Sequence, residues 1–555
     1  MERPWYKSYA KGVPYQLEYE RTAMPQALSR TAREFPDKTA LIFVDSKISY
    51  KQLNDLANRF ANALIHMGVK SGDRVAMLMP NMPQLVAAVY GAWRAGAVVV
   101  MNNPLYTDPE LEYQFNNSES TFLVTLDLLG PRMIALKPKT KIQNIVIAHI
   151  RDHLKFPKKQ LLPIVAKDKH RNIPPTANVH EWTDILKKYP ASDPKIPVDF
   201  EALACLQYTG GTTGISKGVM LTHANLSKNV QQTVAWFPGF NKGEITQLGV
   251  LPIFHSFGLT CCMNLCTWNG WTDVLIPRPE PQAILEAIHK YRINFFPAVP
   301  TMYVGVLNHP EASKYNLNSI MGCFSGAAPL PVEVIKDFEA KTGSQICEGY
   351  GLSETSPVVT TNPFGGKTKV GSIGLPVSDT DIKVMDLVEG TKEMPVGEAG
   401  EIIIKGPQVT SGYYKMPEET ATAIRDGWLY TGDIGKMDEE GYFYIVDRKK
   451  DMVIAGGYNI YPREIDEILF EHPKILEACA VGIPDPYRGE TIKAFVVLKP
   501  GETLTGEEVI KYCAEKLAKY KVPKMVEFMS TLPKSMVGKI LRKELRAMEM
   551  AKGKK

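Results

Sequence analysis

The stretch YTGGTTGISKG, residues 208–218, combines glycines, hydroxyl side chains and one lysine. Glycine lets backbone N–H groups approach an anion closely, the hydroxyls add hydrogen-bond donors, and Lys217 adds a positive charge. A Walker loop needs GxxxxGK followed by serine or threonine, but here the nearest glycine before Lys217 is Gly214. The residues therefore predict a loop that binds a polyphosphate and differs from the P-loop of kinases and ATPases.

Two later stretches also carry residues that could contact a ligand. EGYGLSETSP, residues 348–357, offers the aromatic ring of Tyr350 and the carboxylate of Glu354. Mg²⁺ prefers hard oxygen ligands and shares them with substrate phosphates. Taken alone, GYGLSE is also typical of a turn and a helix cap. The earlier stretch, FSGAAPLP at residues 324–331, has three small residues against whose backbone a flat base can lie, namely Gly326, Ala327 and Ala328.

Three stretches toward the C-terminus carry the remaining candidates. DGWLYTGDIGKMDEEGYFYIVDRKK, residues 426–450, contains Asp433 and ends in a dense charge run. GGYNIYPREIDEIL, residues 456–469, begins with two glycines, whose lack of a side chain permits close approach of another group. LPKSMVGKILR, residues 532–542, contains Lys539. Taken alone, Asp433 also fits a β-turn, the charge run a solvated linker, and Lys539 a solvated surface.

These six stretches, in their order along the chain, resemble the motifs of the adenylate-forming enzymes, which include acyl-CoA synthetases, luciferase-like enzymes and nonribosomal adenylation domains. The resemblance covers residues 208–542, and the N-terminal third is also similar, notably at NPLYTDPELEYQ. The whole chain resembles the bacterial-type long-chain fatty acid–CoA ligases. A nonribosomal module would continue into a carrier domain, whereas this chain stops soon after Lys539.

The resemblance assigns roles to the residues that match each motif. The catalytic residues would be Lys539, Glu354 and the hinge residue Lys450. Mg²⁺ would be held by Glu354 with Thr209. The acyl group and CoA would lie against His255, Gly456 and Gly457. ATP and AMP would contact the largest set: Thr209, Gly210, Gly211, Thr212, Thr213, Gly214, Lys217, Gly326, Ala327, Ala328, Glu348, Gly349, Tyr350, Gly351, Ser353, Asp433 and Arg448.

The reaction implied by the resemblance has two steps, with ATP and CoA as co-substrates and Mg²⁺ as cofactor. The fatty acid carboxylate attacks the α-phosphorus of ATP, pyrophosphate leaves, and an acyl-adenylate forms. The CoA thiol then attacks the carbonyl carbon and AMP leaves. Both reactants of the first step are anions, so the protein must mainly neutralise and position charge. The alternative is a ligase for a medium-chain, aryl or hydroxycinnamate-like acid on the same mechanism.

The acyl pocket is the least determined part of the site. His255, in LPIFHSFGLT, matches a histidine that lies beside the acyl pocket in relatives, and a core histidine between apolar neighbours fits equally well. The apolar run at residues 257–266 is compatible with the wall of an acyl tunnel and with ordinary core packing.

The elements that must position these residues follow from the hydrophobic pattern. Residues 53–69 have helical spacing, with Ser49 and Gln52 ahead of them as a capping arrangement, and the next apolar runs, DRVAMLMP and AVVVM, predict buried strands. The loop at residues 208–218 follows a strand-like run and precedes a helical stretch that begins near His223. Such alternation predicts an α/β fold with layered, mostly parallel sheets.

The pattern of predicted helices and strands changes twice along the chain. Short strands with Gly-rich turns predict a β-rich subdomain at about residues 381–446. We expect an N-terminal adenylation domain over residues 1–447, a hinge at about 447–451, and a small, mobile α+β domain over 448–555.

Composition limits the function classes. The chain has 555 residues and a formal net charge of +5 without a long Lys/Arg block, which gives no support for a nucleic-acid binder. Eight scattered cysteines predict buried thiols and a reducing, cytoplasmic compartment. The segment at residues 153–171 mixes lysines with apolar residues, so it fits either a solvated basic face or peripheral contact with anionic lipid. A homodimer is compatible with the sequence, as is a monomer.

Overall fold

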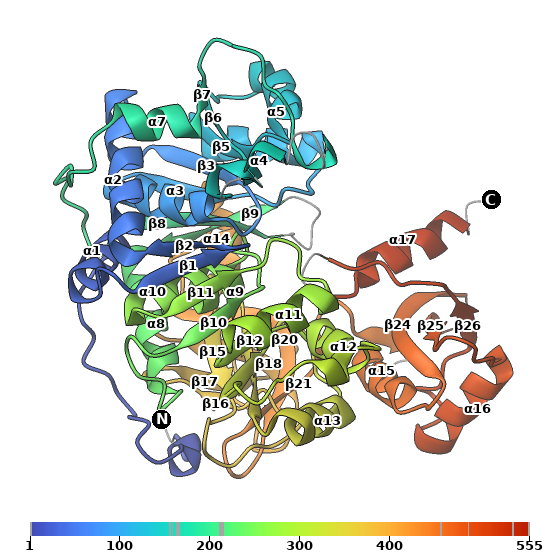
Figure 1. Cartoon of the computed structure of the whole chain (residues 1–555). Helices are drawn as coiled ribbons and strands as arrows, with labels where there is room; N and C mark the ends of the chain where they lie inside the picture. The colour runs from blue at the N-terminus through green and yellow to red at the C-terminus, as the bar shows by residue number, and fades with distance from the viewer. Residues whose placement is uncertain are drawn as a thin grey trace.

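The computed structural model describes residues 3–154, 157, 159–161, 167–209, 216–455, 458–486, 488–535 and 538–552. Seven residues that the sequence assigns to the site lie outside these ranges: Gly210, Gly211, Thr212, Thr213, Gly214, Gly456 and Gly457. Figure 1 shows a large body, drawn from blue to orange, with a smaller orange and red unit beside it.

Two large sheets form most of the body, and most of their strand pairs are parallel. The strand order of the first sheet is β7-β6-β5-β3-β4-β8-β9. Its strands are β3 (Arg74–Leu78), β4 (Val98–Met101), β5 (Phe122–Leu126), β6 (Asn144–Ala148), β7 (Val179–Glu181), β8 (Leu203–Thr209) and β9 (Lys217–Thr222). The predicted strands in DRVAMLMP and AVVVM are β3 and β4, which confirms them.

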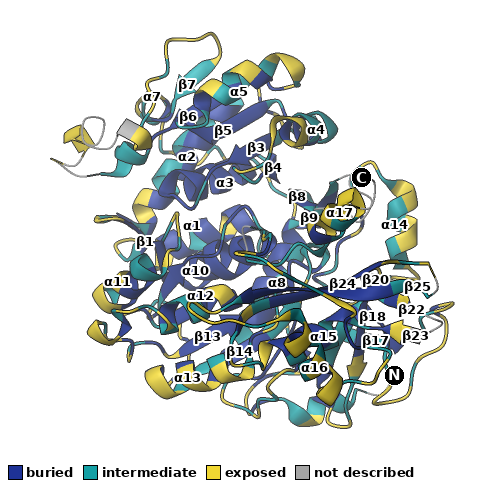
Figure 2. Ribbon diagram, turned by 90° about the vertical axis from the view of Figure 1, so that its right-hand side faces the viewer, coloured by how far each residue is buried: buried dark blue, intermediate teal, exposed yellow. Residues whose placement is uncertain are grey.

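The second large sheet has nine strands in the order β16-β15-β14-β13-β12-β10-β11-β1-β2, with antiparallel pairs at its two ends. Its strands are β1 (Thr39–Phe43), β2 (Ser46–Ser49), β10 (Thr246–Gly249), β11 (Thr272–Leu275), β12 (Phe295–Ala298), β13 (Gly322–Ser325), β14 (Gln345–Gly351), β15 (Val358–Thr361) and β16 (Leu375–Pro376). Its strands are largely buried beneath helices, as Figure 2 shows in dark blue.

Helices cover the faces of both sheets. In the first half of the chain they are α1 (Met24–Glu34), α2 (Tyr50–His66), α3 (Pro83–Arg94), α4 (Asp108–Ser118), α5 (Gly130–Leu136), α7 (Trp182–Lys188), α8 (His223–Ala235), α9 (Ser256–Gly258) and α10 (Leu265–Asn269). In the second half they are α11 (Pro281–Tyr291), α12 (Pro300–Leu307), α13 (Val332–Thr342), α14 (Pro417–Ala423), α15 (Pro462–Phe470), α16 (Gly506–Lys516) and α17 (Arg542–Lys552).

The start of α2 shows how local sequence sets an element. The Ser49 hydroxyl accepts a hydrogen bond from the Gln52 backbone N–H at 3.2 Å, and the Gln52 side chain accepts from the Ser49 N–H at 2.9 Å. This reciprocal capping box confirms the predicted cap. The helix begins at Tyr50, three residues before the first residue of the predicted apolar repeat, because helical backbone follows the cap directly.

Two smaller sheets follow in the chain. Residues 381–448 form a five-stranded antiparallel sheet from β17 (Asp381–Met385), β18 (Gly400–Lys405), β19 (Ile424–Arg425), β20 (Trp428–Met437) and β21 (Phe443–Arg448). The last sheet contains β22 (Val453–Ala455), β23 (Tyr458–Ile460), β24 (Ile475–Asp485), β25 (Gly489–Leu498) and β26 (Met525–Phe528).

The residues from Val453 onward, with α15 to α17, form a separate unit that we call the C-terminal unit. It has its own apolar clusters, in which the described members all come from Val453 or later in the chain. The rest of the protein, up to Arg448, is called the main body. The fold is therefore the predicted mixed α/β architecture, with a large body of mostly parallel sheets, an antiparallel sheet at residues 381–448 and a smaller C-terminal unit of strands and helices.

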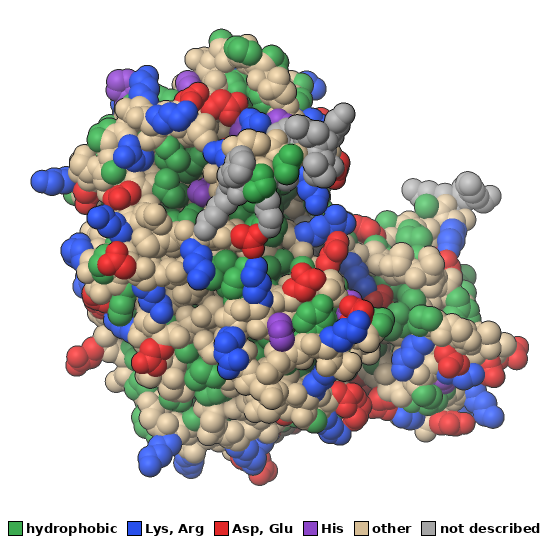
Figure 3. All heavy atoms as spheres, in the orientation of Figure 1, with side chains coloured by type: hydrophobic (Ala, Val, Ile, Leu, Met, Phe, Trp, Pro, Cys, Tyr) green, Lys and Arg blue, Asp and Glu red, His purple; other side chains and the backbone are tan. Residues whose placement is uncertain are grey.

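The structure bears on two expectations that were based on composition. All eight cysteines are buried and unpaired, as predicted. Among the described helices, none combines the length and the apolar character needed to cross a membrane. On the face drawn in Figure 3, basic and acidic side chains are intermixed and do not form one broad field of a single sign.

Candidate active site

The predicted phosphate loop joins two paired strands. Thr209 is the last residue of β8 and Lys217 is the first of β9, and the two are partners in the antiparallel register. The Ser216 hydroxyl donates to the Thr209 carbonyl at 2.8 Å and closes the base of the loop. Helix α8 begins at His223, as predicted, but β9 separates it from the loop. Lys217 is therefore held on a strand, and the loop does not lead directly into a helix.

Lys217 begins a chain of contacts that leads to Glu354. Its ammonium forms an ion pair with Glu419 of α14 and lies 5.1 Å from the centre of the Tyr413 ring. The Tyr413 hydroxyl donates to Glu354 Oε1 at 2.9 Å. Sequence reasoning missed Tyr413 and Glu419, which lie between the recognised motifs, and only the glycine before Tyr413 offers a local signal. The structure brings the predicted phosphate-binding lysine and the predicted metal-binding carboxylate to one cluster.

Glu354 lies in a short 3₁₀ turn, Ser353–Thr355, that follows β14. Burial raises the pKa of its carboxyl above the ordinary value, and the hydrogen bond from Tyr413 acts in the opposite direction. A nearby cation stabilises the charged form of a buried carboxyl group such as this one. The neighbouring Ser353 hydroxyl lies 3.2 Å from the Ser256 hydroxyl of α9, which connects this turn to the segment that carries His255.

Tyr350, Asp433 and Arg448 form a three-residue node. The Tyr350 hydroxyl donates to Asp433 Oδ2 at 2.6 Å, and Arg448 Nε lies 3.1 Å from Asp433 Oδ1. Asp433 and Arg448 are cross-strand partners on β20 and β21, while Tyr350 comes from β14 of a different sheet. Asp433 is buried. The three residues that sequence reasoning assigned to adenine and ribose therefore meet, and they hold one another in place.

The small residues near β13 and β14 have structural reasons for their size. A Cβ atom on Gly349 would lie 2.3 Å from the Phe324 ring, and one on Gly351 would lie 2.0 Å from the Pro357 carbonyl oxygen. Both glycines are therefore required by the packing of the chain itself. Ala327 adopts the left-handed conformation, with φ of +69°, directly after Gly326. This turn places the small residues, Ala328 included, immediately after the end of β13.

Glu348 lies at the base of this region. Its carboxylate accepts backbone hydrogen bonds from Leu330 and Gly371, each at 3.3 Å. The pKa of Glu348 is raised to about 7, mainly by burial, while the two backbone hydrogen bonds act in the opposite direction. The side chain thus ties the stretch at residues 324–331 to β14, so its observed contacts position the small-residue turn.

Lys539 is carried to the same region by the C-terminal unit. Burial, together with the charges of Arg448 and Lys450, lowers its pKa to about 8, and the charge of Asp433 acts in the opposite direction. The His255 imidazole has a pKa lowered to about 4 by burial and by the charge of Lys539. The electrostatics therefore connect Lys539 with the Asp433 node on one side and with the His255 segment on the other.

The loop that carries Lys539 is braced internally and against the main body. The Ser535 N–H donates to the Lys539 carbonyl at 2.8 Å, and the Lys539 N–H donates to the Ser535 hydroxyl at 3.2 Å. Gly538 has φ of +70°, and a Cβ atom there would lie 2.6 Å from Thr301 Oγ1 of α12. Only glycine allows this approach without displacement, so the loop and α12 are in close contact.

A cavity of about 240 Å³ lies beside this contact. Its wall combines residues of the main body with residues of the Lys539 loop: Pro279, Pro281, Ile284, Val299, Thr301, Met302, Lys534, Ser535 and Gly538. The cavity is therefore formed jointly by the two parts of the protein.

Lys450 lies between the last strand of the body, β21, and the first strand of the C-terminal unit, β22. Burial and the charge of Arg448 lower its pKa below the ordinary value. Its carbonyl oxygen accepts a hydrogen bond from Arg546 Nη1 at 3.3 Å, and the Asp451 carbonyl accepts from Nη2 at 3.2 Å. Helix α17 therefore contacts the short connection between the two parts.

His255 begins the predicted acyl region. Its Nδ1 accepts a hydrogen bond from the Phe257 N–H at 3.2 Å, which caps α9. The segment continues as a π-helix, Leu259–Asn264, and then as α10, with all residues from Ser256 to Asn269 buried. A π-helical turn is rare and often marks a functional site. The Phe257 ring also lies 3.2 Å from the position that a Cβ on Gly326 would take.

Comparison with known families now decides the class of protein. A model described as AMP-binding enzyme matches residues 28–414, and one described as AMP-binding enzyme C-terminal domain matches residues 464–539. The chain belongs to the AMP-binding enzymes. The two matches flank residues 415–463, the part of this AMP-binding enzyme that contains Asp433, Arg448 and Lys450.

Relatives and solved structures match nearly the whole AMP-binding enzyme. A long-chain-fatty-acid–CoA ligase of Bacillus subtilis (strain 168) is 46% identical over 98% of each chain. A ligase of the same name from Escherichia coli O6:H1 is 37% identical over 100% of this chain and 99% of its own. The crystal structure of ATP-bound MatB from Rhodopseudomonas palustris superposes with a TM-score of 0.83 at 31% identity, over 94% of this chain and 98% of that one.

Proposed function

We propose that this AMP-binding enzyme is an ATP-dependent fatty acid–CoA ligase that acts on long-chain acids. The observation that carries the proposal is the close contact of the Lys539 loop with the main body at Gly538 and Thr301, with the charges of Arg448 and Asp433 acting on Lys539. The full-length similarity to long-chain-fatty-acid–CoA ligases supports the choice of substrate class.

In the first half-reaction the fatty acid carboxylate attacks the α-phosphorus and pyrophosphate leaves. The Lys539 ammonium is placed to neutralise charge at the α-phosphorus, where two anions must approach each other. Asp433 accepts hydrogen bonds from the ribose hydroxyls, held in place by Arg448 and Tyr350. The loop between Thr209 and Lys217 binds the β- and γ-phosphates that depart.

We further propose that Glu354 and the Thr209 hydroxyl hold Mg²⁺. The residues fit this ion because both offer hard oxygen atoms, and because the buried Glu354 carboxyl gains from a neighbouring cation. When bound, Mg²⁺ screens the negative charge of the ATP phosphates. Tyr413 keeps the Glu354 carboxylate in position through its 2.9 Å hydrogen bond.

The second half-reaction needs a different placement of the C-terminal unit. We propose that the chain consists of domains at residues 1–447 and 448–555, and that the second turns about Lys450 within the connection at 447–451. This motion would withdraw Lys539 from the site and bring Gly456 and Gly457 toward the thiol. Hinges are short connections of this kind that absorb a large backbone change.

The acyl chain is assigned to the buried segment that follows His255, residues 257–266. A saturated chain needs an apolar wall, and every residue of this segment is buried, with its larger apolar side chains in two of the main apolar clusters. An aryl or hydroxycinnamate-like acid would need a shorter, wider pocket in the same place, so it is the second candidate class.

The direct test is release of AMP from ATP by purified protein with CoA and a panel of acids. The panel runs from acetate through laurate and palmitate to oleate, with benzoate and ferulate as aryl members. We expect AMP release to be highest with long-chain acids and to require CoA and Mg²⁺. Release that is highest with an aryl acid would move the proposal to the second class, and no release with any acid would refute it.

We propose a cytoplasmic enzyme whose basic segment at residues 153–171 rests on anionic membranes, where long-chain acids partition. Part of that segment, including Lys158, lies outside the described residues. Co-sedimentation with liposomes containing phosphatidylglycerol should fall for Lys159→Glu combined with Lys169→Glu. Unchanged co-sedimentation would remove the membrane proposal and leave the enzymatic one intact.

A further inference from the structure

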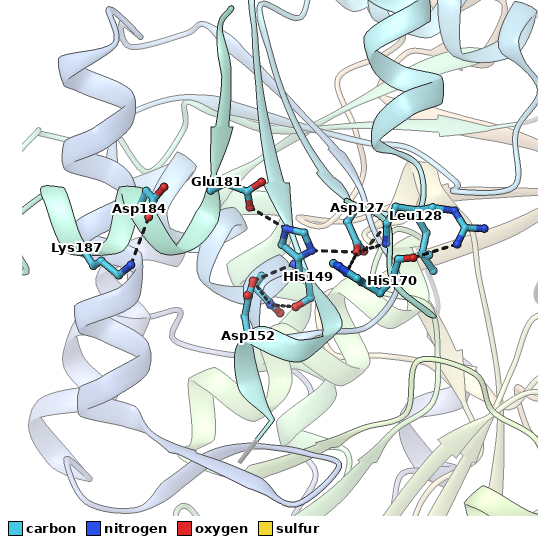
Figure 4. A network of polar contacts seen from close by, with 10 residues as sticks. Asp127, Leu128, His149, Asp152, His170, Glu181, Asp184 and Lys187 are labelled. Carbon is cyan, nitrogen blue, oxygen red and sulfur yellow. Dashed lines mark hydrogen bonds and ion pairs between the residues drawn. The ribbon is translucent and has the colours of Figure 1, made fainter. Parts of the chain in front are cut away.

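A cluster of titratable side chains lies at the carboxyl ends of β5, β6 and β7 (Figure 4). Asp127 directly follows β5, His149 directly follows β6, and Glu181 ends β7. Thr209 lies at the carboxyl end of β8, on the same edge of this parallel sheet. Three strand spacings separate β5 from β8, or about 14 Å. The cluster is therefore separate from the nucleotide site.

Three metal-ligand atoms converge in this cluster. The Oδ2 atom of Asp127 lies 3.0 Å from His149 Nδ1 and 2.9 Å from His170 Nδ1, and all three atoms lie within 4.8 Å of one another. His170 is the only one of the three that is not placed by a strand end; it precedes β7 along the chain. The fold thus brings His149 and His170 next to Asp127, although they lie 22 and 43 positions from it in the chain.

A fourth side chain orients one of the imidazoles. The Nε2 atom of His149 lies 2.7 Å from Glu181 Oε2. A hydrogen bond from Nε2–H to a carboxylate leaves Nδ1 of the neutral ring as the lone-pair donor that faces Asp127. Histidine ligands of metals commonly carry such a carboxylate on their second nitrogen, which fixes the tautomer and the ring orientation.

The cluster is buried and rich in negative charge. The Asp127 side chain is 0% exposed, that of His149 is 5% exposed and that of His170 is 13% exposed. The backbone N–H groups of Leu128 and Arg171 donate to Asp127, and a third carboxylate, Asp152, accepts from the His149 N–H at 2.9 Å. The carboxylates of Asp127 and Glu181 thus contact the His149 ring, and a fully buried carboxylate such as Asp127 is stabilised by a neighbouring positive charge.

We propose that Asp127, His149 and His170 form a site for a divalent transition-metal ion of the zinc class. Imidazole nitrogen and carboxylate oxygen are ligands that zinc accepts, with bonds of about 2.0–2.2 Å. Tetrahedral ligands at that distance lie about 3.3 Å from one another, so the two close pairs need to separate by only a few tenths of an ångström. A water molecule would complete the coordination.

The metal would act as a structural cross-link. His170 lies at the end of the excursion between β6 and β7 that contains residues 153–169, and His149 lies at its beginning. Binding both residues to Asp127 would fix the two ends of the excursion to the edge of the sheet. The site takes no part in the proposed acyl transfer.

The test uses the full-length, tag-free protein with ZnCl₂ as the probe, in competition with a chromophoric chelator. Mildly alkaline pH is chosen because the ligands must be deprotonated to bind. The folded wild type should bind one zinc ion per chain, and His170→Gln and Asp127→Asn should lose it. Glu181→Gln should keep the site with an affinity lower by about 10–100-fold.

His180→Gln is the matched control. His180 lies next to Glu181 on β7, and its Nε2 is 3.0 Å from Asn144 Oδ1, outside the cluster. This variant should bind zinc as the wild type does. The buried cysteines are not expected to contribute in the folded protein.

Two outcomes would overturn the proposal. One is zinc binding by the wild type that is no tighter than that of His170→Gln. The other, used if the variants fail to fold, is a wild type that takes up Co²⁺ without the intense visible absorption of a tetrahedral complex. A rise in melting temperature with ZnCl₂ that occurs in the wild type and in His180→Gln, and is lost in His170→Gln, would support it.

Discussion

The Asp433 node and the Lys539 loop, which we propose to act on the same nucleotide, are held in different ways. Asp433 is bonded by Tyr350 and Arg448, which come from two sheets of the main body. Lys539 is bonded through its backbone to Ser535 of its own loop, and that loop contacts the main body through Gly538 and Thr301. The first arrangement suits a permanent part of the proposed site, and the second suits the proposed withdrawal of Lys539 after adenylation.

Lys539→Ala tests the comparison with the largest expected effect. Formation of the acyl-adenylate should fall by about 10²–10³-fold, because a preorganised charge at the α-phosphorus is lost. Thioester formation from supplied acyl-adenylate and CoA should remain close to that of the wild type. The two half-reactions are measured separately as pyrophosphate release and as acyl-CoA formation. Equal losses in both would contradict the removable role of Lys539.

Asp433→Asn should affect both half-reactions. The substitution removes the charge that Arg448 and Tyr350 hold, and hydrogen bonds to charged groups contribute about 1.5–3 kcal/mol, which corresponds to roughly a 10–100-fold loss. The same two assays are used, with ATP in the first and acyl-adenylate in the second. A loss confined to the first half-reaction would make Asp433 resemble Lys539 and remove the distinction between the two regions.

The pH dependence of adenylation reports the state of Lys539. Its pKa of about 8 lies below the ordinary lysine value, so the ammonium loses its proton as pH rises through 8. We expect kcat/KM for adenylation to fall above that pH, by about tenfold one unit higher, because this quantity reports groups of the free enzyme. Lys539→Arg should move the fall to higher pH, since arginine stays protonated. If kcat/KM falls at the same high pH in both proteins, the fall is caused by a group other than Lys539.

Gly538→Ala should have the smallest effect. The new Cβ would meet Thr301 Oγ1 at 2.6 Å and would also be strained at φ of +70°. We expect the adenylation rate to fall by about fivefold, which corresponds to about 1 kcal/mol, with little change in thioester formation. Gly501→Ala is the control, because Gly501 also has a positive φ, of +82°, with no atom within 4 Å of the added Cβ. Equal effects of the two variants would assign the loss to backbone strain.

Local patterns predicted those parts of the fold that depend on neighbouring residues. The cap formed by Ser49 and Gln52 involves residues three apart, and the runs that became β3 and β4 are continuous apolar segments. The motif residues Asp433, Arg448, Tyr350 and Glu354 were recognised by resemblance, and the structure brings Asp433, Arg448 and Tyr350 together.

Contacts between distant segments could not be predicted in this way. Tyr413 reaches Glu354 across 59 residues, and nothing in its own neighbourhood indicates that contact. The strand β9 between the phosphate loop and α8 was also missed, because KGVMLT reads as a continuation toward the helix. Asp127 and His170 are 43 residues apart, so their proximity depends on the order of strands in the sheet.

The cavity beside Gly538 is a place where a bound small molecule could interrupt the proposed catalytic cycle. Because its wall is shared between α11, α12 and the Lys539 loop, it exists only while the two parts of the protein are assembled in this arrangement. In the proposed cycle, a compound that fills it would act as an interfacial inhibitor that allows activation of the acid but prevents the proposed turn of the C-terminal unit. Such a compound would cause acyl-adenylate to accumulate on the enzyme, which distinguishes it from any competitor of ATP, CoA or the fatty acid.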